Sequence, residues 1–489
     1  MMGRQQPPQE KLFVTGFSLE RRIRQNHPLR KIIEKIDFTF IYDEVIEKYG
    51  HNGNVSVPPP VLLKLMLLLV FYNVRSEREL METLPERLDW LWFLGYDLED
   101  EIPNHSVLSK ARRRWGGEIF QRFFERVVKQ CVEVGMVDGS KIFIDSSLVE
   151  ADASNDSVID TRDLKSQLSQ KYRQLEARLD EIPSARETGP YTDVNQRYVS
   201  SSDPDAAVVR RGDSKLRYQS HRAVENSGVI TATAVTPGDV NEAHLLMGLA
   251  RRHEATTGEK VKTVVADSKY GTINNYLSCR DAGIDAHIPA FKGGTKKRLK
   301  NRGLFMEDRF NYVADRDVYI CPAAKELKRR TIHKRSAKIE YMAPKRVCAS
   351  CELRDQCTRS KSSRTVMRHL RQEELDEMRS KALSRESRRN LKRRQHLCEG
   401  SFGNGKRYGY KRARWRRLWR VEIQDALTCT VQNIMKLLKH RNDRREAVCL
   451  VADRSVVWYV NSVWRFEPLM NSACPISFGG QDRLLPNVV

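Results

Sequence analysis

The first strong pattern along the chain is an apolar run over residues 61–72, which only Lys64 interrupts. Three prolines, residues 58–60, come directly before the run, and proline is favoured in the first turn of a helix but disrupts its interior. The run is shorter than the ~20 apolar residues that a membrane-spanning helix needs. It therefore predicts a buried helix, within a region of helical patterns that ends near Gly135.

Basic residues gather toward the end of these helical patterns. Residues 103–106 break the chain, and a further helix is expected over residues 107–115. Its four cations are Lys110, Arg112, Arg113 and Arg114. Short helices with a basic last member are typical of a helix-turn-helix module that places one helix in a DNA groove. A helical cap domain with a solvated basic end fits the same composition equally well.

Two short apolar, β-branched segments each end in an aspartate. Residues 141–144 lead into Asp145, and residues 261–266 lead into Asp267. Such segments predict buried strands. Because ligands of open α/β sheets bind where strands end, the two carboxylates are expected to converge. A single Asp is more often a turn former or a helix cap, but the pair together favours a catalytic site.

The patterns around these strands complete an α/β fold. Apolar residues within 164–182 recur at spacings of three and four, which predicts an amphipathic helix. A polar loop is expected over residues 186–213, followed by a hairpin of two strands, residues 216–224 and 229–235. Residues 291–299 form a basic stretch that predicts either a phosphate-binding loop or a solvated one.

Four of the ten cysteines are clustered in the sequence. A C-x-x-C pair, Cys348 and Cys351, lies between Cys321 and Cys357. Four thiolates can fill a tetrahedral zinc site that holds together a segment too polar to fold alone. The gap before Cys357 is wider than the usual two to four residues, so the pattern indicates a structural zinc ion without establishing it. The isolated cysteines elsewhere predict reduced thiols.

A single acid, Glu399, stands inside a strongly basic segment near the C-terminus. Residues 374–394 before it have helical propensity, and Gly400 and Gly403 follow it, so Glu399 is expected on a helix or at its end. A second, amphipathic helix over residues 427–438 is expected to close the core. Glu399 is either a counter-charge that stabilises its helix or a metal ligand held against a polyanion.

Composition indicates a polyanionic partner. The chain has 489 residues, with 86 Lys and Arg against 63 Asp and Glu, which gives a formal net charge of +23. This charge favours nucleic acid first and an anionic membrane surface second. The length exceeds one ordinary core, so about two or three domains are expected. The polar N-terminus shows no secretory signal, which predicts a cytoplasmic, nucleoid-associated protein without a membrane partner.

Three acids on these elements fit the chemistry of phosphodiester cleavage: Asp145, Asp267 and Glu399. In-line attack profits from two divalent ions ~3.5–4 Å apart, one activating the nucleophile and the other stabilising the leaving oxygen. Mg²⁺ and Mn²⁺ prefer carboxylate and water oxygens, so three acids are sufficient ligands. The surrounding cations would then hold the DNA backbone. Alternative acids nearby are Asp152, Asp156, Glu386 and Glu422.

In their order along the chain, residues 142–147, 265–271 and 399–403, with Lys406, resemble the DDE transposases of bacterial insertion sequences. The resemblance covers most of the chain. It implies an α/β fold with a ribonuclease-H-like mixed sheet flanked by helices, an N-terminal all-α domain, and a cysteine-rich insertion between the second Asp and the Glu. It departs from some relatives, which have Tyr and Arg at the places of Lys392 and Gln395.

Carried over by position, the resemblance implies a site. The catalytic residues and ligands of two Mg²⁺ or Mn²⁺ ions would be Asp145, Asp267 and Glu399, and Lys406 would contact DNA. Synapsis of two DNA ends in such enzymes implies a homo-oligomer on DNA. The further cations expected to bind DNA are Lys269, Arg393, Arg394, Arg412, Arg414, Arg112 and Arg113.

The expected division of the chain follows these patterns. It comprises an N-terminal arm (1–34), a helical DNA-binding domain (35–135), the first part of the catalytic core (136–290, with an inserted segment 160–213), a basic, cysteine-rich insertion (291–384), the second part of the core (385–440) and an accessory tail (441–489).

The expected function is a metal-dependent DNA transposase that binds the ends of a mobile element, cleaves DNA strands and transfers them to a target. Two other classes remain open. One is a DNA-binding regulator or transposase derivative without activity, and the other is a zinc-containing RNA-binding protein.

Overall fold

In this computed structural model, the described residues are 2–4, 18–50, 54–160, 198–211, 213–290 and 303–463, with 441–463 described as backbone only. The chain forms two compact units, residues 1–438 and 439–489, and the account below concerns the first. The amphipathic helix predicted within 164–182 and the basic loop 291–299 lie outside the described residues.

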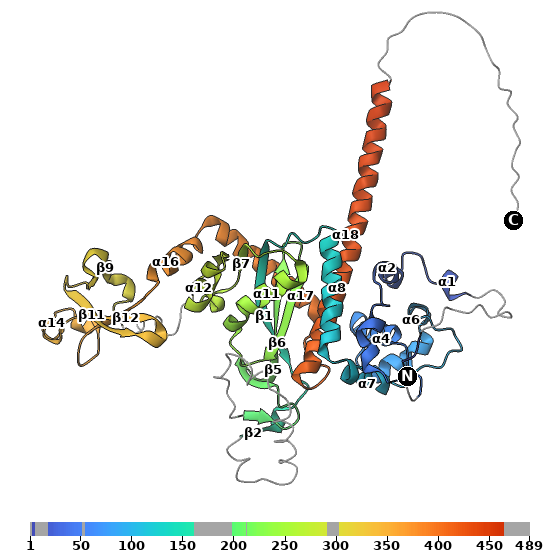
Figure 1. Ribbon diagram of the computed structural model, residues 1–489, viewed down its shortest axis with the longest axis horizontal. Helices are drawn as coiled ribbons and strands as arrows, with labels where there is room; N and C mark the ends of the chain where they lie inside the picture. The colour runs from blue at the N-terminus through green and yellow to red at the C-terminus, as the bar shows by residue number, and fades with distance from the viewer. Residues whose placement is uncertain are drawn as a thin grey trace, which may run out of the picture. The chain divides into compact units, whose positions relative to one another are not determined.

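The N-terminal part of the chain is helical (Figure 1). Its longest apolar helix, α4, runs from Pro59 to Phe71 and is buried almost all round, as its uninterrupted apolar pattern predicts. Residues 18–34 were expected to be an arm, but Leu29 and Ile32 are fully buried in the helical core. The other helices are α1 (Leu19–Arg22), α2 (Pro28–Lys35), α3 (Ile41–Val45), α5 (Glu77–Thr83), α6 (Leu88–Leu94), α7 (Ser106–Trp115) and α8 (Gly117–Glu133).

A mixed sheet follows, in the order β4-β5-β1-β7-β8, and a sixth strand, β6, also pairs with β5. β1 is antiparallel to β5 and parallel to β7, and β7 is parallel to β8. β5 and β6 form the predicted hairpin. The strands are β1 (Lys141–Glu150), β4 (Ala207–Arg211), β5 (Asp213–Glu225), β6 (Ile230–Pro237), β7 (Thr263–Val265) and β8 (Asp285–His287).

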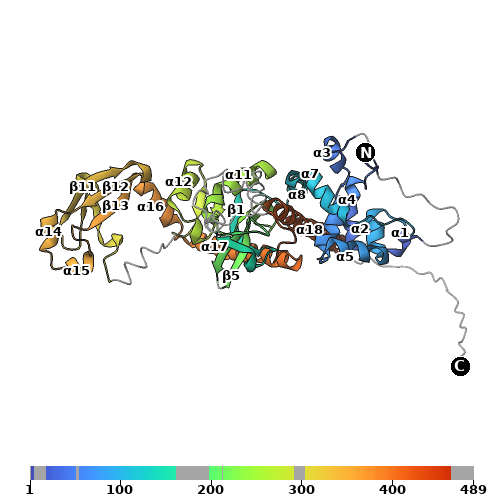
Figure 2. The same cartoon turned by 90° about the horizontal axis from the view of Figure 1, so that it is seen from below.

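Both faces of this sheet are covered by helices. Ile142 and Ile144 of β1 belong to one core with α11 (Leu246–Thr257) and α12 (Ile273–Asp281). Phe143 belongs to the other core, which contains residues of the N-terminal helices, α17 and α18. Figure 2 shows α11 and α17 on opposite sides of β1. Side chains alternate along a strand, so the pattern of β1 assigns each residue to one of these two faces.

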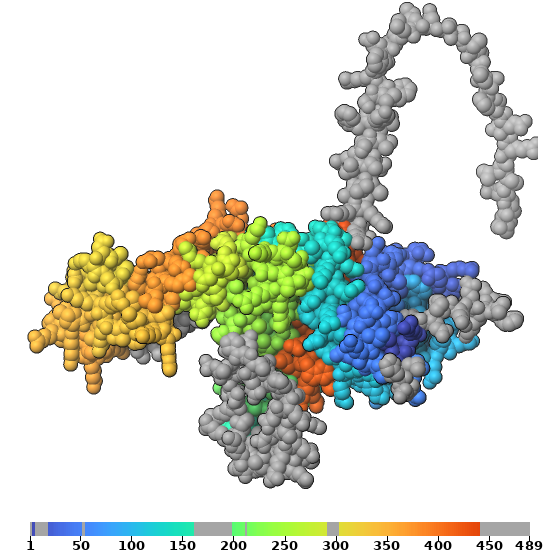
Figure 3. Space-filling view, in the orientation of Figure 1, coloured from blue at the N-terminus to red at the C-terminus, as the bar shows by residue number. Residues whose placement is uncertain are grey.

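A second, five-stranded antiparallel sheet lies between β8 and α17 in the sequence, in the order β13-β12-β11-β10-β9. It packs on a small core that includes Tyr319, Leu327 and Tyr341. Most residues of β11 are exposed, and the sheet forms part of the yellow surface in Figure 3. The elements are β9 (Asn311–Val313), β10 (Val318–Ile320), β11 (Glu326–His333), β12 (Lys338–Met342), α14 (Lys345–Ala349), α15 (Arg354–Cys357) and β13 (Thr365–His369); a separate two-stranded ribbon pairs β2 (Val158–Asp160) with β3 (Tyr198–Ser200).

Three helices complete the chain: α16 (Gln372–Lys381), α17 (Arg385–Arg407) and α18 (Leu418–Val463). The prediction that Gly400 and Gly403 loosen the helix around Glu399 was wrong, because α17 continues through both. The amphipathic helix predicted over residues 427–438 is confirmed as part of α18, which extends beyond the expected core boundary. No helix in the described residues is long and apolar enough to span a membrane.

Candidate active site

Asp145 lies in the middle of a strand and not at its end as predicted. β1 continues to Glu150 because the residues after Asp145 keep pairing with β5, from Ser146 opposite His221 onward. Alternation along the strand places Asp145 on the same face as Phe143, toward α17. Arg394 of α17 forms an ion pair with Asp145 at 2.6 Å.

Asp267 stands on the neighbouring strand at the matching level. Phe143 of β1 pairs with Val265 of β7, so the two aspartates each follow this pair by two residues. Asp267 caps the short helix η5 (Ser268–Tyr270), where its Oδ1 accepts a hydrogen bond from the Lys269 backbone N–H at 2.9 Å. The structure therefore brings these two predicted acids together, one within β1 and the other just beyond β7.

A third acid, Glu242, joins them and was missed from the sequence. It begins the short helix η4 (Glu242–Leu245) after β6, and only 5% of its surface is exposed. Its carboxylate accepts hydrogen bonds from the Ser146 hydroxyl and the Gln219 amide, the latter at 3.1 Å, and forms an ion pair with Lys269. Glu242 lies seven residues after the predicted strand 229–235, and Asp239 lies nearer to that strand, so no sequence pattern singled out Glu242.

The three acids act on one another. Burial raises the pKa of the Asp145 carboxyl above its ordinary value, Asp267 and Glu242 add to that rise, and Arg394 opposes it. Burial and the charges of the same acids also raise the pKa of Tyr270, which is fully buried. These residues form one electrostatically coupled group, which we call the acidic centre: Asp145, Asp267 and Glu242.

Glu399 does not contact the acidic centre. Its side chain is exposed on α17, where Oε1 accepts a hydrogen bond from Gln395 at 3.1 Å. The adjacent Cys398 faces inward, and its thiol lies 3.8 Å from the Phe143 carbonyl oxygen of β1. Among the described residues, no three His, Cys, Asp or Glu side chains are grouped closely enough to hold a metal ion. Two of the three predicted metal ligands are thus brought together, and the third lies on the helix beside them.

A buried polar network fixes α17 against the sheet. Arg222, opposite Asp145 on β5, is fully buried and donates hydrogen bonds to the Ser401 carbonyl at 3.1 Å and hydroxyl at 3.0 Å. It pairs with Asp425 of α18 at 3.3 Å. A Cβ at Gly405 would lie 3.4 Å from the guanidinium, so glycine permits this close approach. The network positions the helix that carries Glu399.

Some of the residues predicted to contact DNA are exposed, and others are partly or fully buried. Lys406, Arg393, Arg412 and Arg113 are exposed. Arg393 donates a hydrogen bond to the Asn226 carbonyl at 3.0 Å, and Arg412 pairs with Asp152 at 3.0 Å. Exposed ion pairs of this kind are weak, so these four cations are available to a polyanion.

Three other predicted DNA contacts are engaged inside the protein. Arg112 is buried, pairs with Glu77, and lies 3.9 Å over the Trp415 ring, which argues against a phosphate contact. Arg394 is paired with Asp145, as described above. Arg414 donates to the Asn73 side chain at 2.8 Å and to the Val74 carbonyl, and so joins the segment before α18 to the N-terminal helices. The remaining predicted contact, Lys269, is paired with Glu242.

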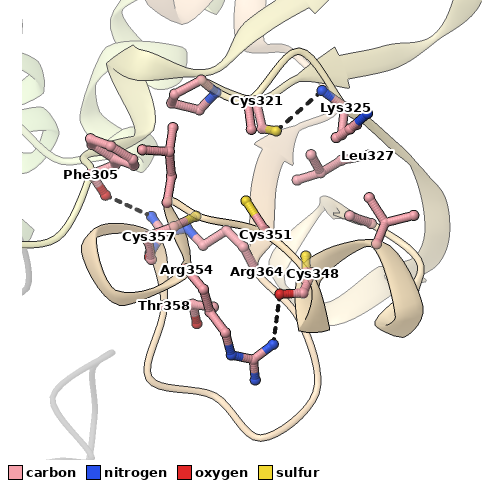
Figure 4. A pocket seen from close by; sticks show the side chains of 15 residues that line it. Phe305, Cys321, Lys325, Leu327, Cys348, Cys351, Arg354, Cys357, Thr358 and Arg364 are labelled. Carbon is pink, nitrogen blue, oxygen red and sulfur yellow. Dashed lines mark hydrogen bonds between the residues drawn. The ribbon is translucent and has the colours of Figure 1, made fainter.

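The four clustered cysteines line one pocket beside the second sheet. Figure 4 shows the sulfur atoms of Cys321, Cys348, Cys351 and Cys357 around a common space. The Cys321 sulfur accepts a hydrogen bond from the Lys325 N–H at 3.4 Å. Burial raises the pKa of the Cys357 thiol, and the other three thiols add to the rise. The sequence cluster is therefore a spatial one, although its thiols do not form a closed metal site in the described structure.

Comparison with known families identifies two segments. A model described as a transposase domain (DUF772) matches residues 17–114, and a model described as a transposase DDE domain matches residues 320–438. The second match includes Glu399 and the four clustered cysteines, whereas Asp145 and Asp267 lie outside both matched segments. A search of curated proteins gives no match.

Proposed function

Because the chain belongs to the DDE transposases of insertion sequences, we propose that it cleaves DNA at the ends of a mobile element and joins the freed 3′-hydroxyls to target DNA. The observation that carries this proposal is the placement of Asp145 and Asp267 at the same level of two neighbouring strands. These two acids lie in a chain whose net charge is +23. A strongly basic protein with a focused acidic centre suits a polyanionic substrate and a divalent ion.

We also propose a ribonuclease-H-like core. Supporting features are the mixed sheet, with three antiparallel strands on one side and two parallel strands continuing from β1, and the helices on both faces. Asp145 within β1 and Asp267 just beyond β7 lie at the same level of the sheet, and α17, the helix that carries Glu399, packs beside β1.

Asp145 and Asp267 supply two carboxylates of the proposed divalent-metal site. Burial is the main cause of the raised pKa of the Asp145 carboxyl, the charges of Asp267 and Glu242 add to it, and a hard cation would favour the ionised form. Asp145 and Asp267 would hold the ions, with Glu399 contributed by α17. Bound Mg²⁺ or Mn²⁺ supplies a polarised nucleophile and a stabilised leaving oxygen. Arg394, which pairs with Asp145 here, would shift its guanidinium to the phosphate as the acid takes up its ligand role.

The exposed cations Lys406, Arg393, Arg412 and Arg113 are proposed to hold the DNA backbone. Phosphate contacts of this kind fix the position of the duplex without reading its sequence. Recognition of two element ends would require two copies of the chain, so we propose a homo-oligomer on DNA.

Lys406→Ala is expected to reduce the salt dependence of DNA binding. Loss of one phosphate contact should lower the slope of log K against log salt concentration by about 0.9. Fluorescence anisotropy with a labelled duplex from ~50 to 200 mM salt measures this slope. The matched control is Lys260→Ala, which removes an equally exposed lysine distant in sequence from α17 and should leave the slope unchanged. An unchanged slope for Lys406→Ala would remove this residue from the interface.

The activity itself is tested with a labelled duplex that carries the sequence flanking the gene, incubated with the protein and Mg²⁺ or Mn²⁺. Metal-dependent release of a 3′-hydroxyl end is the expected result. Binding without any nicking, unaffected by Asp145→Ala, would instead identify a DNA-binding regulator. Tighter binding to RNA than to duplex DNA, independent of Asp267, would identify an RNA-binding protein.

We further propose that Cys321, Cys348, Cys351 and Cys357 hold a structural zinc ion, because all four line one pocket. The core of the second sheet is small, and a metal would supply stability that so few apolar residues cannot. Binding would draw the thiols inward and deprotonate them, reversing the raised pKa of Cys357.

Cys351→Ser is expected to lower the zinc content of purified protein from about one ion per chain to well below half. Elemental analysis of protein prepared without chelator measures the content directly. Cys279→Ala, which alters a buried cysteine outside the pocket, should retain zinc. Absence of zinc from both the unmodified protein and Cys279→Ala would show that the pocket is a reduced thiol cluster.

A further inference from the structure

Three arginines act on one another where α7 approaches the start of α18. Arg113 is exposed on α7, Arg417 lies directly before α18, and Arg420 lies in the first turn of α18. The pKa of the Arg420 guanidinium lies below its ordinary value, because of burial first and then because of the positive charges of Arg113 and Arg417. An anion bound between the three cations would relieve this repulsion.

The carboxylates nearest to these arginines are already occupied by other donors. Glu77 pairs with the buried Arg112, and Asp203 accepts a hydrogen bond from the Tyr218 hydroxyl at 2.7 Å. Both acids act on Arg420, but each does so less strongly than either of the two neighbouring arginines. The electrostatic potential at this place is therefore positive despite the acids.

Arg417 has a strained backbone and an unpaired side-chain nitrogen. Its φ angle is +83°, in the left-handed region that is uncommon for a residue other than glycine. Two carboxylates hold it there: Asp203 accepts a hydrogen bond from the Arg417 N–H at 2.9 Å, and Asp205 accepts one from the Leu418 N–H at 2.9 Å. The buried Nη1 of Arg417 has no hydrogen-bond partner among the described residues. Strain of this kind clusters at ligand-binding sites, and buried nitrogens are nearly always paired, so the missing partner is expected to come from outside the chain.

We propose that Arg113, Arg417 and Arg420, which we call the arginine cluster, bind a backbone phosphate of DNA. This inference rests on the proposed function, which supplies DNA as the polyanion. The planar guanidinium presents parallel N–H donors that match two phosphate oxygens. Arg113 belongs to the first segment matched by a transposase model and the other two arginines belong to the second, so one bound strand would contact both segments.

The test measures DNA binding by the full chain with fluorescence anisotropy at several salt concentrations. Arg420→Gln and Arg417→Gly are each expected to lower the slope of log K against log salt concentration by about 0.9. The loss of affinity should be equal on an element end and on an unrelated duplex, because a phosphate contact does not read sequence. The matched control is Arg122→Gln, which removes an exposed arginine of α8 that pairs with Glu44 and should leave the slope unchanged.

A second measurement separates ligand binding from a structural role. Glycine adopts positive φ without strain, so Arg417→Gly is expected to raise the urea midpoint of unfolding while DNA binding weakens. The control is Ala337→Gly, at a position of the second sheet with a φ angle of +50°, which should raise the midpoint and leave DNA binding unchanged. A lowered midpoint with an unchanged slope in Arg417→Gly protein would make Arg417 a structural residue.

The outcomes separate this inference from the proposed function. An unchanged slope in Arg420→Gln protein with native circular dichroism overturns the arginine cluster, whatever the stability of Arg417→Gly. An equal fall of the slope in Arg122→Gln would show that only net charge matters, and it overturns the inference as well. If the unmodified protein releases 3′-hydroxyl ends while both cluster variants keep its slope, only this inference fails. If the variants lower the slope but the unmodified protein cleaves no DNA, the proposed function fails and the phosphate site stands.

Discussion

Asp145→Asn and Asp267→Asn should each lower the rate of DNA strand cleavage by ~10³-fold or more, equivalent to ~4 kcal/mol of activation free energy. Both substitutions keep the shape of the side chain and remove the charge that would hold a divalent ion. DNA binding should persist, because the exposed cations that we assign to the backbone lie elsewhere. Single-turnover cleavage of a labelled element end, with anisotropy on the same duplex, measures both quantities.

Asp156→Asn is the matched control for this pair. Asp156 is an exposed acid shortly after β1, and its backbone N–H donates a hydrogen bond to the Ser154 hydroxyl oxygen at 3.2 Å. Loss of the Asp156 charge should change the rate of DNA strand cleavage less than twofold. Equal activity of Asp145→Asn and Asp156→Asn would show that the acidic centre has no part in catalysis.

Arg222→Met should cost ~3–5 kcal/mol of unfolding free energy, because it leaves the Asp425 carboxylate buried without its positive partner. Asp425 would retain the hydroxyls of Ser220, at 2.9 Å, and Thr233, which are too few to replace a guanidinium. The same loss should release α17, since Arg222 also binds the Ser401 backbone. Urea denaturation measures the stability, and limited proteolysis within α17 measures the release.

Two further variants separate charge from packing. Arg222→Met combined with Asp425→Leu removes both charges and should recover most of the lost stability. Asp152→Asn breaks the exposed pair with Arg412 and should cost less than ~1 kcal/mol. A single Arg222→Met variant as stable as Asp152→Asn would mean that the buried network does not hold the helix.

The sequence predicted the elements whose patterns are local. The apolar run became α4, the alternating segments became the β5–β6 hairpin, and the apolar spacing over 427–438 became part of α18. The placement of Asp145 near Asp267 was also predicted, because both residues follow apolar segments that form neighbouring parallel strands. In each case the pattern that predicts the helix or strand lies within one short segment of the sequence.

Long-range partners produced the errors. β1 continues past Asp145 because β5 pairs with its polar half, and nothing in the residues after Asp145 reveals that partner. α17 continues through Gly400 and Gly403 because its other face packs on Arg222 and the sheet, which outweighs the modest helix cost of glycine. Tertiary packing overrode local propensity at both places.

The sequence also did not reveal the interaction partners of individual charged side chains. Glu242 was not singled out from the sequence, because only folding brings Ser146, Gln219 and Lys269 around it. Arg112 looked like a DNA contact within a basic helix, but Glu77 and Trp415 lie far from it in sequence and occupy its guanidinium. Charge along a sequence does not reveal which side chains fold inward.

The route of the chain out of the first sheet has an evolutionary consequence. The chain departs after β8 and comes back at α17, where the Asn390 amide donates a hydrogen bond to the His287 ring at 2.8 Å. Beside this point Arg280 of α12 forms an ion pair with Glu377 of α16 at 2.6 Å. This ion pair links the segment where the chain leaves the first sheet to the segment where it returns. The segment between β8 and α17 has its two ends next to each other in the fold, so it can be lengthened, shortened or exchanged between related proteins at little entropic cost. Diversification is therefore expected to concentrate there, while the carboxylates on the neighbouring strands stay in register.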